Sequence, residues 1–484
     1  MTAPPRAPVR AAGGSRSGWQ PPRALLVVGV LVVALLLTDA VAQAVTPYIR
    51  RDDWPYLLPP HTPDATDVYA KNLNEGRWLN WVWWLVVGQH GTAVSAALTY
   101  VAAYALFVAG FWRLVRRRLP SLHWAVDALL GLGLFTSVLW VHLFYWPGTL
   151  TPSVLVAAAG VWTLPAASRR RSHLALWLLG TTVLAVLTYP PVAGVLIVCV
   201  ALQLGAQSWR RLALVGLGFL LAYAVGIGVV YVLNAIAFGH PGVVVAAWRR
   251  PNPLTSLYDA KVNTLRALRS LARLGVAVWP ALVVGVVAVA VGLWDRSVRP
   301  RVLRVLAAVA LVVGLGALQT LVTGVVTDPR GELWVWPAVV LPAALLLAGS
   351  HWSPRVGVAA LAALAVIGTL TWRADVGDHQ ASQRRYAALA QEATALRPDG
   401  SRPLVVLYQA PRERATARGR ITAGTLQMMI RAESGGLVPR WCRPAECTRI
   451  AARAPHRGTA GGAGTVVRVG TLVGVVVPHP PARL

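Results

Sequence analysis

The sequence predicts an all-α polytopic membrane protein with about eleven transmembrane helices, followed by a small extracytoplasmic α/β domain. Of its 484 residues, 56% are hydrophobic and only 13% are charged, about half of the charged fraction of a soluble domain. Apolar runs recur along residues 24–372, and a run of about 18 residues or more is typical of a membrane span. Residues 373–484 lack such runs and instead alternate strand and helix patterns.

The first apolar run follows a Pro-, Gly-, Ser- and Arg-rich segment, residues 1–23, which we expect to be a disordered cytoplasmic N-terminus. This run is too long for a signal peptide and has no clear cleavage site, so it predicts a retained first helix. The predicted spans are 24–46, 91–112, 124–145, 151–167, 174–189, 191–207, 212–236, 275–294, 305–325, 333–349 and 356–372.

Arginine-rich loops predict the orientation of these spans, because cytoplasmic loops carry an excess of positive charge. Such loops follow every second span, at 113–118, 169–171, 210–211, 295–304 and Arg355. The N-terminus is therefore predicted inside, and the C-terminus outside. The predicted outer loop 237–274 carries six basic residues and breaks the pattern. Leucines on one helical face and arginines on the other predict an amphipathic helix at the membrane interface within this loop. Residues 174–207 fit either two spans or a re-entrant hairpin.

The net charge of +28 would also suit a nucleic-acid-binding protein. Most of this charge lies in short loops and a tail that flank apolar runs, which favours membrane topology as its explanation. We therefore expect the lipid bilayer, and no nucleic acid, among the partners.

The polar C-terminal segment predicts a strand at 403–408, a helix at 421–433 and a strand pair at 464–478 that is interrupted at Gly470. Cys442 and Cys447 lie five residues apart on the predicted outer side. Because that compartment is oxidising, they are expected to form a disulfide. Two cysteines without neighbouring histidines are a poor zinc site.

The predicted outer loop 47–90 opens with two adjacent acids, Asp52 and Asp53. One interpretation is that they are solvated charges that balance Arg50 and Arg51. The other is that they are catalytic carboxylates at the membrane surface, where a base takes the proton of a sugar hydroxyl that attacks an anomeric carbon. We favour Asp53 as that base, because the adjoining arginines could pair with Asp52.

Asp52 and Asp53 directly after the first span, with Gly76, Arg77 and Trp78 further along the same loop, resemble the motifs of the type II O-antigen glucosyltransferase family. That family belongs to the GT-C class of membrane glycosyltransferases. The resemblance covers roughly residues 20–390 and implies a GT-C-like fold for residues 24–372. It also implies transfer of a sugar, such as glucose, from a polyprenyl phosphate to a cell-envelope glycan, without a nucleotide-sugar site.

Several further residues are candidates for substrate binding. Arginine's fork of donors suits a phosphate leaving group, so Arg77, Arg249, Arg250 and Arg330 are candidates for the carrier phosphate. For each, anchoring at lipid headgroups or a local ion pair is the alternative. The candidates for sugar contacts are Trp78, Asn80, Trp81 and Tyr145, where an interfacial aromatic belt is the alternative for the tryptophans.

Three functions therefore compete: a glycosyltransferase of the plasma membrane, a transporter or flippase of lipid-linked glycans, and a non-catalytic assembly protein. Polar groups concentrate at the outer rim of the spans, whereas a transporter places ionisable residues within the bundle. This favours outer-surface chemistry. No cofactor is indicated, although a divalent cation could bridge Asp52 or Asp53 to a phosphate.

Overall fold

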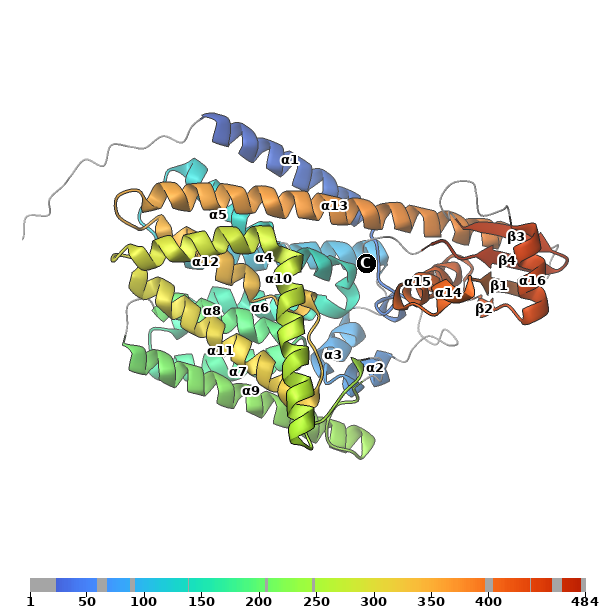
Figure 1. The fold of residues 1–484 in the computed structure, drawn as a ribbon, viewed down its shortest axis with the longest axis horizontal. Helices are drawn as coiled ribbons and strands as arrows, with labels where there is room; N and C mark the ends of the chain where they lie inside the picture. The colour runs from blue at the N-terminus through green and yellow to red at the C-terminus, as the bar shows by residue number, and fades with distance from the viewer. Residues whose placement is uncertain are drawn as a thin grey trace, which may run out of the picture.

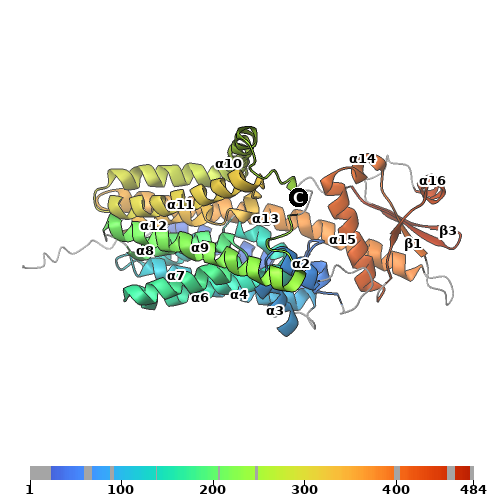
Figure 2. The ribbon, with the colours of Figure 1, turned by 90° about the horizontal axis from the view of Figure 1, so that it is seen from below.

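The computed structural model describes residues 23–58, 68–87, 92–137, 139–204, 208–245, 249–396, 404–435, 437–454 and 464–479. The predicted disordered N-terminus lies outside these residues, apart from Arg23 at the start of the first helix. Figures 1 and 2 show a bundle of long helices and a smaller domain beyond one of its ends.

Each of the eleven predicted spans overlaps one α-helix of this bundle, although the span 124–145 is α-helical only as far as Phe135. The helices are α1 (Arg23–Val45), α4 (Ala93–Arg116), α5 (Trp124–Phe135), α6 (Pro147–Ala167), α7 (Arg171–Val186), α8 (Pro191–Leu204), α9 (Trp209–Phe238), α10 (Leu257–Trp294), α11 (Arg299–Thr323), α12 (Val335–Leu346) and α13 (Ser353–Ala395).

Among the described residues, six helices are long and apolar enough to cross a membrane, namely α4, α6, α9, α10, α11 and α13. The chain therefore has the character of a multi-pass helical membrane protein. Val33–Val45 of α1 and helices α5, α7, α8 and α12 are apolar but shorter. Apart from α1, which has 23 residues in all, these helices fall below the roughly 20 residues of a full span. The number of spans, predicted as eleven, therefore stays a prediction.

Hydrogen bonds between loops define two ends of the bundle. At one end, Arg118 donates to the carbonyl of Gln203, and Ser350 N donates to Asp295 Oδ2 at 2.7 Å. At the other end, Arg50 N donates to the carbonyl of Tyr145 at 3.0 Å. Leu79 N likewise donates to the carbonyl of Leu187 at 3.1 Å there. The segments that carry most of the predicted site residues thus meet at one end.

Five short elements shape that end. The 3-10 helices η1 (Trp54–Tyr56), η3 (Trp140–Tyr145) and η5 (Pro329–Gly331) lie in connections between bundle helices. The short helices α2 (Val68–Asn74) and α3 (Trp78–Val86) belong to the connection between α1 and α4.

The predicted amphipathic outer loop 237–274 contains the first part of helix α10. The helix begins at Leu257 and continues without a loop to Trp294, with non-helical dihedrals only at Val278, two residues before Pro280. A proline inside a helix removes one backbone hydrogen bond and so explains a kink rather than a break. Before the kink, Leu257, Leu265, Leu268 and Leu271 are exposed, as expected of a helix that lies at a membrane surface.

Helix α13 corrects the predicted domain boundary at 372/373, which falls inside it. The apolar pattern stops near residue 372, but the helix continues to Ala395. Hydropathy marks where a helix leaves the membrane, whereas backbone hydrogen bonding decides where it ends. Figure 1 shows α13 running along the whole bundle and on into the smaller domain.

The C-terminal domain contains a four-stranded sheet of order β2-β1-β4-β3. Its elements are β1 (Leu404–Tyr408), α14 (Pro411–Arg414), α15 (Ala417–Glu433), β2 (Arg440–Trp441), α16 (Pro444–Arg453), β3 (Thr465–Val469) and β4 (Leu472–Val476). Strand β1 is parallel to β2 and β4, and β3 pairs antiparallel with β4 across the turn at Gly470. Helix α15 lies on the side of the sheet that faces the bundle (Figure 2).

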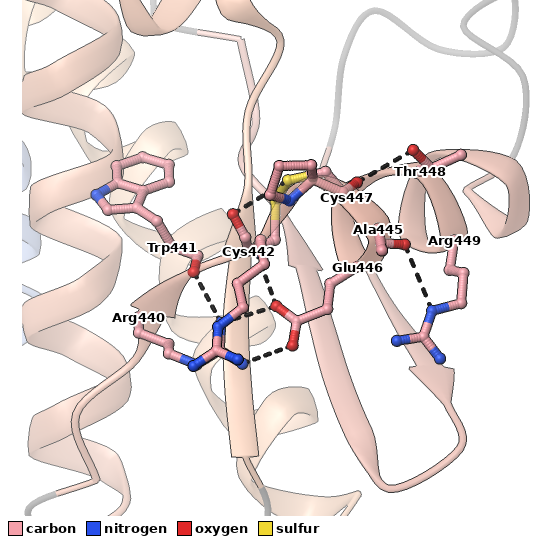
Figure 3. The surroundings of a disulfide bond; sticks show 10 residues. Arg440, Trp441, Cys442, Ala445, Glu446, Cys447, Thr448 and Arg449 are labelled. Atoms are coloured by element: carbon pink, nitrogen blue, oxygen red, sulfur yellow. Dashed lines mark hydrogen bonds and ion pairs between the residues drawn. A yellow bond between two sulfur atoms is a disulfide. The ribbon is translucent and has the colours of Figure 1, made fainter.

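A disulfide joins Cys442 to Cys447 and links the end of β2 to α16, with a Cα–Cα distance of 5.3 Å (Figure 3). Beside it, Arg440 makes a bidentate ion pair with Glu446, at 2.7 and 2.6 Å. Glu446 also accepts from the backbone N–H of Arg443 at 2.8 Å, so the start of α16 is tied to β2. Hydrogen bonds from Arg440 lower the pKa of Glu446 to about 2.

Candidate functional site

Asp53 is fully buried and caps the N-terminus of α6. Its Oδ2 accepts from Gly148 N at 2.7 Å, and its Oδ1 accepts from Thr149 N at 2.8 Å and from the Thr149 hydroxyl. The first amides of a helix lack internal partners and carry partial positive charge, so a carboxylate there is stabilised. This corrects our preference for Asp53 as the base, because both of its oxygens serve the fold.

Asp52 is exposed and faces the site instead. Its Oδ1 accepts from the indole Nε1 of Trp146 at 2.8 Å. Trp146 immediately precedes α6, so the capping of α6 by Asp53 also places Trp146 opposite Asp52. The two adjacent acids therefore have different roles: one carboxylate holds a helix, and the other is accessible for chemistry.

Two arginines stack on the same indole ring. The guanidinium of Arg330 lies 4.2 Å from the centre of the Trp146 ring, and that of Arg50 lies 5.4 Å from it. Arg330 also pairs with Asp328 at 3.3 Å, and both side chains are partly exposed. Trp146 thus brings Asp52, from the segment after α1, together with Arg330 of η5.

Arg77 lies in the connection between α1 and α4 that also contains α2 and α3. Gly76 before it has φ +77°, a left-handed conformation that glycine adopts without strain. Arg77 pairs with Glu75 at 3.2 Å and stacks over Tyr189, 5.6 Å from the ring centre. Burial lowers the pKa of Arg77, but the negative charges of Glu75 and Asp52 contribute to keeping it above its ordinary value.

Tyr189, in the turn between α7 and α8, connects Arg77 to the other arginines. A Cβ placed on Gly331, next to Arg330, would lie 3.4 Å from the Tyr189 hydroxyl. Burial raises the pKa of Tyr189, whereas the positive charges of Arg330, Arg77 and Arg249 lower it. Arg77 therefore stacks on this tyrosine, Arg330 lies next to Gly331 beside its hydroxyl, and the charge of Arg249 also acts on it.

The remaining predicted residues of this region are placed elsewhere or serve the fold. Trp78 donates from Nε1 to Asn234 at 2.9 Å, and Trp81 packs edge-on against Tyr69. Asn80 is fully buried and donates to the carbonyl of Thr188 at 3.4 Å. Arg250 is exposed, and its carbonyl accepts from Arg266 at 2.8 Å. These four residues make contacts within the fold, and their role in substrate binding stays a prediction.

Tyr145, the other predicted contact, is fully buried and donates its hydroxyl to Asp375 Oδ2. Asp375 also faces two imidazoles. His142 Nδ1 lies 3.4 Å from Asp375 Oδ2, and His379 Nδ1 lies 3.6 Å from Asp375 Oδ1. Sequence reasoning missed Asp375 and His379, because both lie beyond the last apolar run. Their i, i+4 spacing on one helix was the available signal.

The C-terminal domain reaches the rim of this site. A Cβ on Gly424 of α15 would lie 2.2 Å from Cδ of Arg51, the residue before Asp52. The domain is therefore packed directly beside the candidate carboxylate. Among the described residues, no group of three or more His, Cys, Asp or Glu side chains is placed to hold a metal ion.

Together, these observations define a multi-pass helical membrane protein in which the exposed carboxylate of Asp52 lies among arginines and aromatic rings at one end of the bundle. Such a site suits an anionic ligand. No protein-family model, curated protein or solved structure matches the chain.

Proposed function

We propose that the protein is a membrane glycosyltransferase that moves a sugar, a hexose such as glucose, from a polyprenyl phosphate to a cell-envelope glycan on the outer face of the plasma membrane. The observation that carries the proposal is the grouping of Asp52 with Arg77, Arg249 and Arg330 around Trp146 and Tyr189. The resemblance of the Asp-Asp and Gly-Arg-Trp motifs to a glycosyltransferase family supports it.

The chemistry needs two groups that this site offers. Asp52 takes the proton from an acceptor hydroxyl as the hydroxyl oxygen bonds to the anomeric carbon of the donor sugar. The bond from that carbon to the phosphate oxygen breaks, and the electron pair leaves with the polyprenyl phosphate. Arg77 and Arg330, with Arg249 nearby, stabilise the departing phosphate, because guanidinium groups bind such oxygens through paired donors.

The test is transfer of a radiolabelled hexose from polyprenyl phosphate to envelope glycan, by the purified protein reconstituted in vesicles. The glycan is prepared from a strain that lacks this gene. Asp52→Asn should reduce the rate by about 10²–10⁴-fold, the typical cost of losing a general base. Asp378→Asn is the matched control, because Asp378 is an exposed carboxylate on α13 outside this group.

Arg77→Ala and Arg330→Ala should raise KM for the lipid donor. Labelled lipid that crosses the vesicle bilayer without forming a new glycosidic bond, equally in wild type and Asp52→Asn, would contradict glycosyl transfer and favour the flippase alternative.

A further inference from the structure

The environment of His142 differs from that of the other imidazole beside Asp375. His379 is 1% exposed, and its Nδ1 lies 2.7 Å from the carbonyl of Asp375 within the same helix. The side chain of His142 is 37% exposed, and its Nδ1 faces Asp375 Oδ2 at 3.4 Å. Of the two imidazoles, His142 is therefore the one that a ligand can reach.

The position of His142 on η3 places it beside the candidate site. A 3-10 helix has three residues per turn, so His142 and Tyr145 lie on one face, and both contact Asp375. Trp146, the next residue, donates to Asp52 and carries Arg330 on its ring. The short segment from His142 to Trp146 therefore carries both the His142 imidazole and the indole that donates to Asp52. His142 thus lies in the same part of the site as Asp52.

The charges around His142 determine which atom carries its proton. A carboxylate opposite Nδ1 favours the tautomer in which Nδ1 carries the hydrogen, so Nε2 keeps a lone pair. The charged and titratable groups around His142 are Asp375 and His379 of α13, Arg50 after α1, Arg330 of η5 and the Tyr145 hydroxyl. The two arginines disfavour a second proton on the ring.

A neutral imidazole whose Nε2 keeps a lone pair can distinguish the acceptor sugar from the carrier phosphate. Phosphate oxygens can only accept hydrogen bonds, so Nε2 has nothing to donate to the carrier phosphate. A sugar hydroxyl can donate to it. We propose that His142 binds the acceptor glycan by accepting a hydrogen bond from one of its hydroxyls at Nε2, and that Asp375 is the positioning residue that holds the ring. This inference depends on the proposed glycosyl transfer.

The first test is the acceptor dependence of the transfer assay, with envelope glycan from the deletion strain as the probe. His142→Ala should raise KM for the glycan about 2- to 10-fold, the effect of one lost hydrogen bond, and leave KM for the lipid donor unchanged. Asp375→Asn should raise the same KM, because an amide no longer selects the tautomer. His351→Gln is the matched control, since His351 is an exposed histidine in the turn before α13.

The pH dependence separates binding from a merely structural role. Burial, with Arg50 and Arg330, lowers the pKa of His142 although Asp375 raises it. Protonation removes the Nε2 lone pair, so KM for the glycan should rise as pH falls through a midpoint below the ordinary value of about 6.5. His142→Gln offers an amide oxygen that does not titrate, and should remove this dependence. An unchanged pH profile in His142→Gln, or an unchanged KM in His142→Ala, would overturn the proposal.

A second measurement needs no activity. Diethyl pyrocarbonate modifies neutral imidazole, and peptide mass spectrometry follows modification of His142 as pH varies, with N-acetylhistidine as reference. The midpoint for His142 should lie below that of the reference and fall further in Asp375→Asn, because the arginines remain when the carboxylate is gone. Identical midpoints in wild type and Asp375→Asn would refute the His142–Asp375 pair, even if no glycosyl transfer were found. Absent transfer with shifted midpoints would instead refute the proposed function alone.

Discussion

Asp52 and Asp53 are neighbours in sequence, but their carboxylates face different parts of the molecule. Asp53 accepts two backbone N–H groups of α6, so Asp53→Asn should replace one acceptor oxygen by an amide that faces a donor. Charged hydrogen bonds contribute about 1.5–3 kcal/mol each, and a buried unsatisfied group adds to the loss. We expect Asp53→Asn to lower the thermal unfolding midpoint of the detergent-solubilised protein.

Asp52→Asn should leave that midpoint close to wild type, because Asp52 is exposed and an amide oxygen can still accept from Trp146. The two variants therefore separate stability from catalysis at adjacent positions. A stable Asp53→Asn protein without activity would restore Asp53 as the base.

At the level of secondary structure elements, the packing of α13 on α5 decides where Asp375 lies. A Cβ on Gly368 of α13 would lie 2.0 Å from the carbonyl oxygen of Thr136, at the end of α5. Backbone atoms cannot swing aside as a flexible side chain can, so Gly368→Ala should force the two helices apart. Overpacking of this kind typically costs about 1–3 kcal/mol.

We expect Gly368→Ala to lower the unfolding midpoint and, two turns further along α13, to displace Asp375 from His142. Gly377→Ala on the same helix is the control, because a Cβ there meets no atom within 4 Å. Alanine in an open helical position favours the helix by up to about 1 kcal/mol over glycine. Equal midpoints for the two variants would contradict this account of α13 packing.

For the whole molecule, the positive loops predict that the C-terminal domain is extracytoplasmic. A reporter that is active only in the cytoplasm, fused after Leu484, should therefore be inactive. Thiol labelling of the native protein, denatured without a reductant, should reach only Cys199, because Cys442 and Cys447 are joined. An active reporter together with three labelled cysteines would place the domain in the cytoplasm.

The sequence by itself determined the membrane character of the chain and the approximate position of every apolar helix, because burial in lipid requires long apolar runs. It also indicated the strands around Gly470, since alternation and a glycine turn are local signals. It could not show that α13 continues beyond residue 372, because hydropathy reports the solvent of a helix rather than its hydrogen bonds.

Only the tertiary structure decided which residues form the site. Asp52 and Asp53 have the same chemistry and the same neighbours in sequence, and they differ only because the N-terminus of α6 takes up one carboxylate. The contact between Tyr145 and Asp375 joins positions 230 residues apart. Such pairs depend on how helices pack, and no periodicity within one segment encodes them. Trp78 of α3 was predicted to contact a sugar, but its indole N–H donates to Asn234 of α9, a contact between two helices that the sequence does not show.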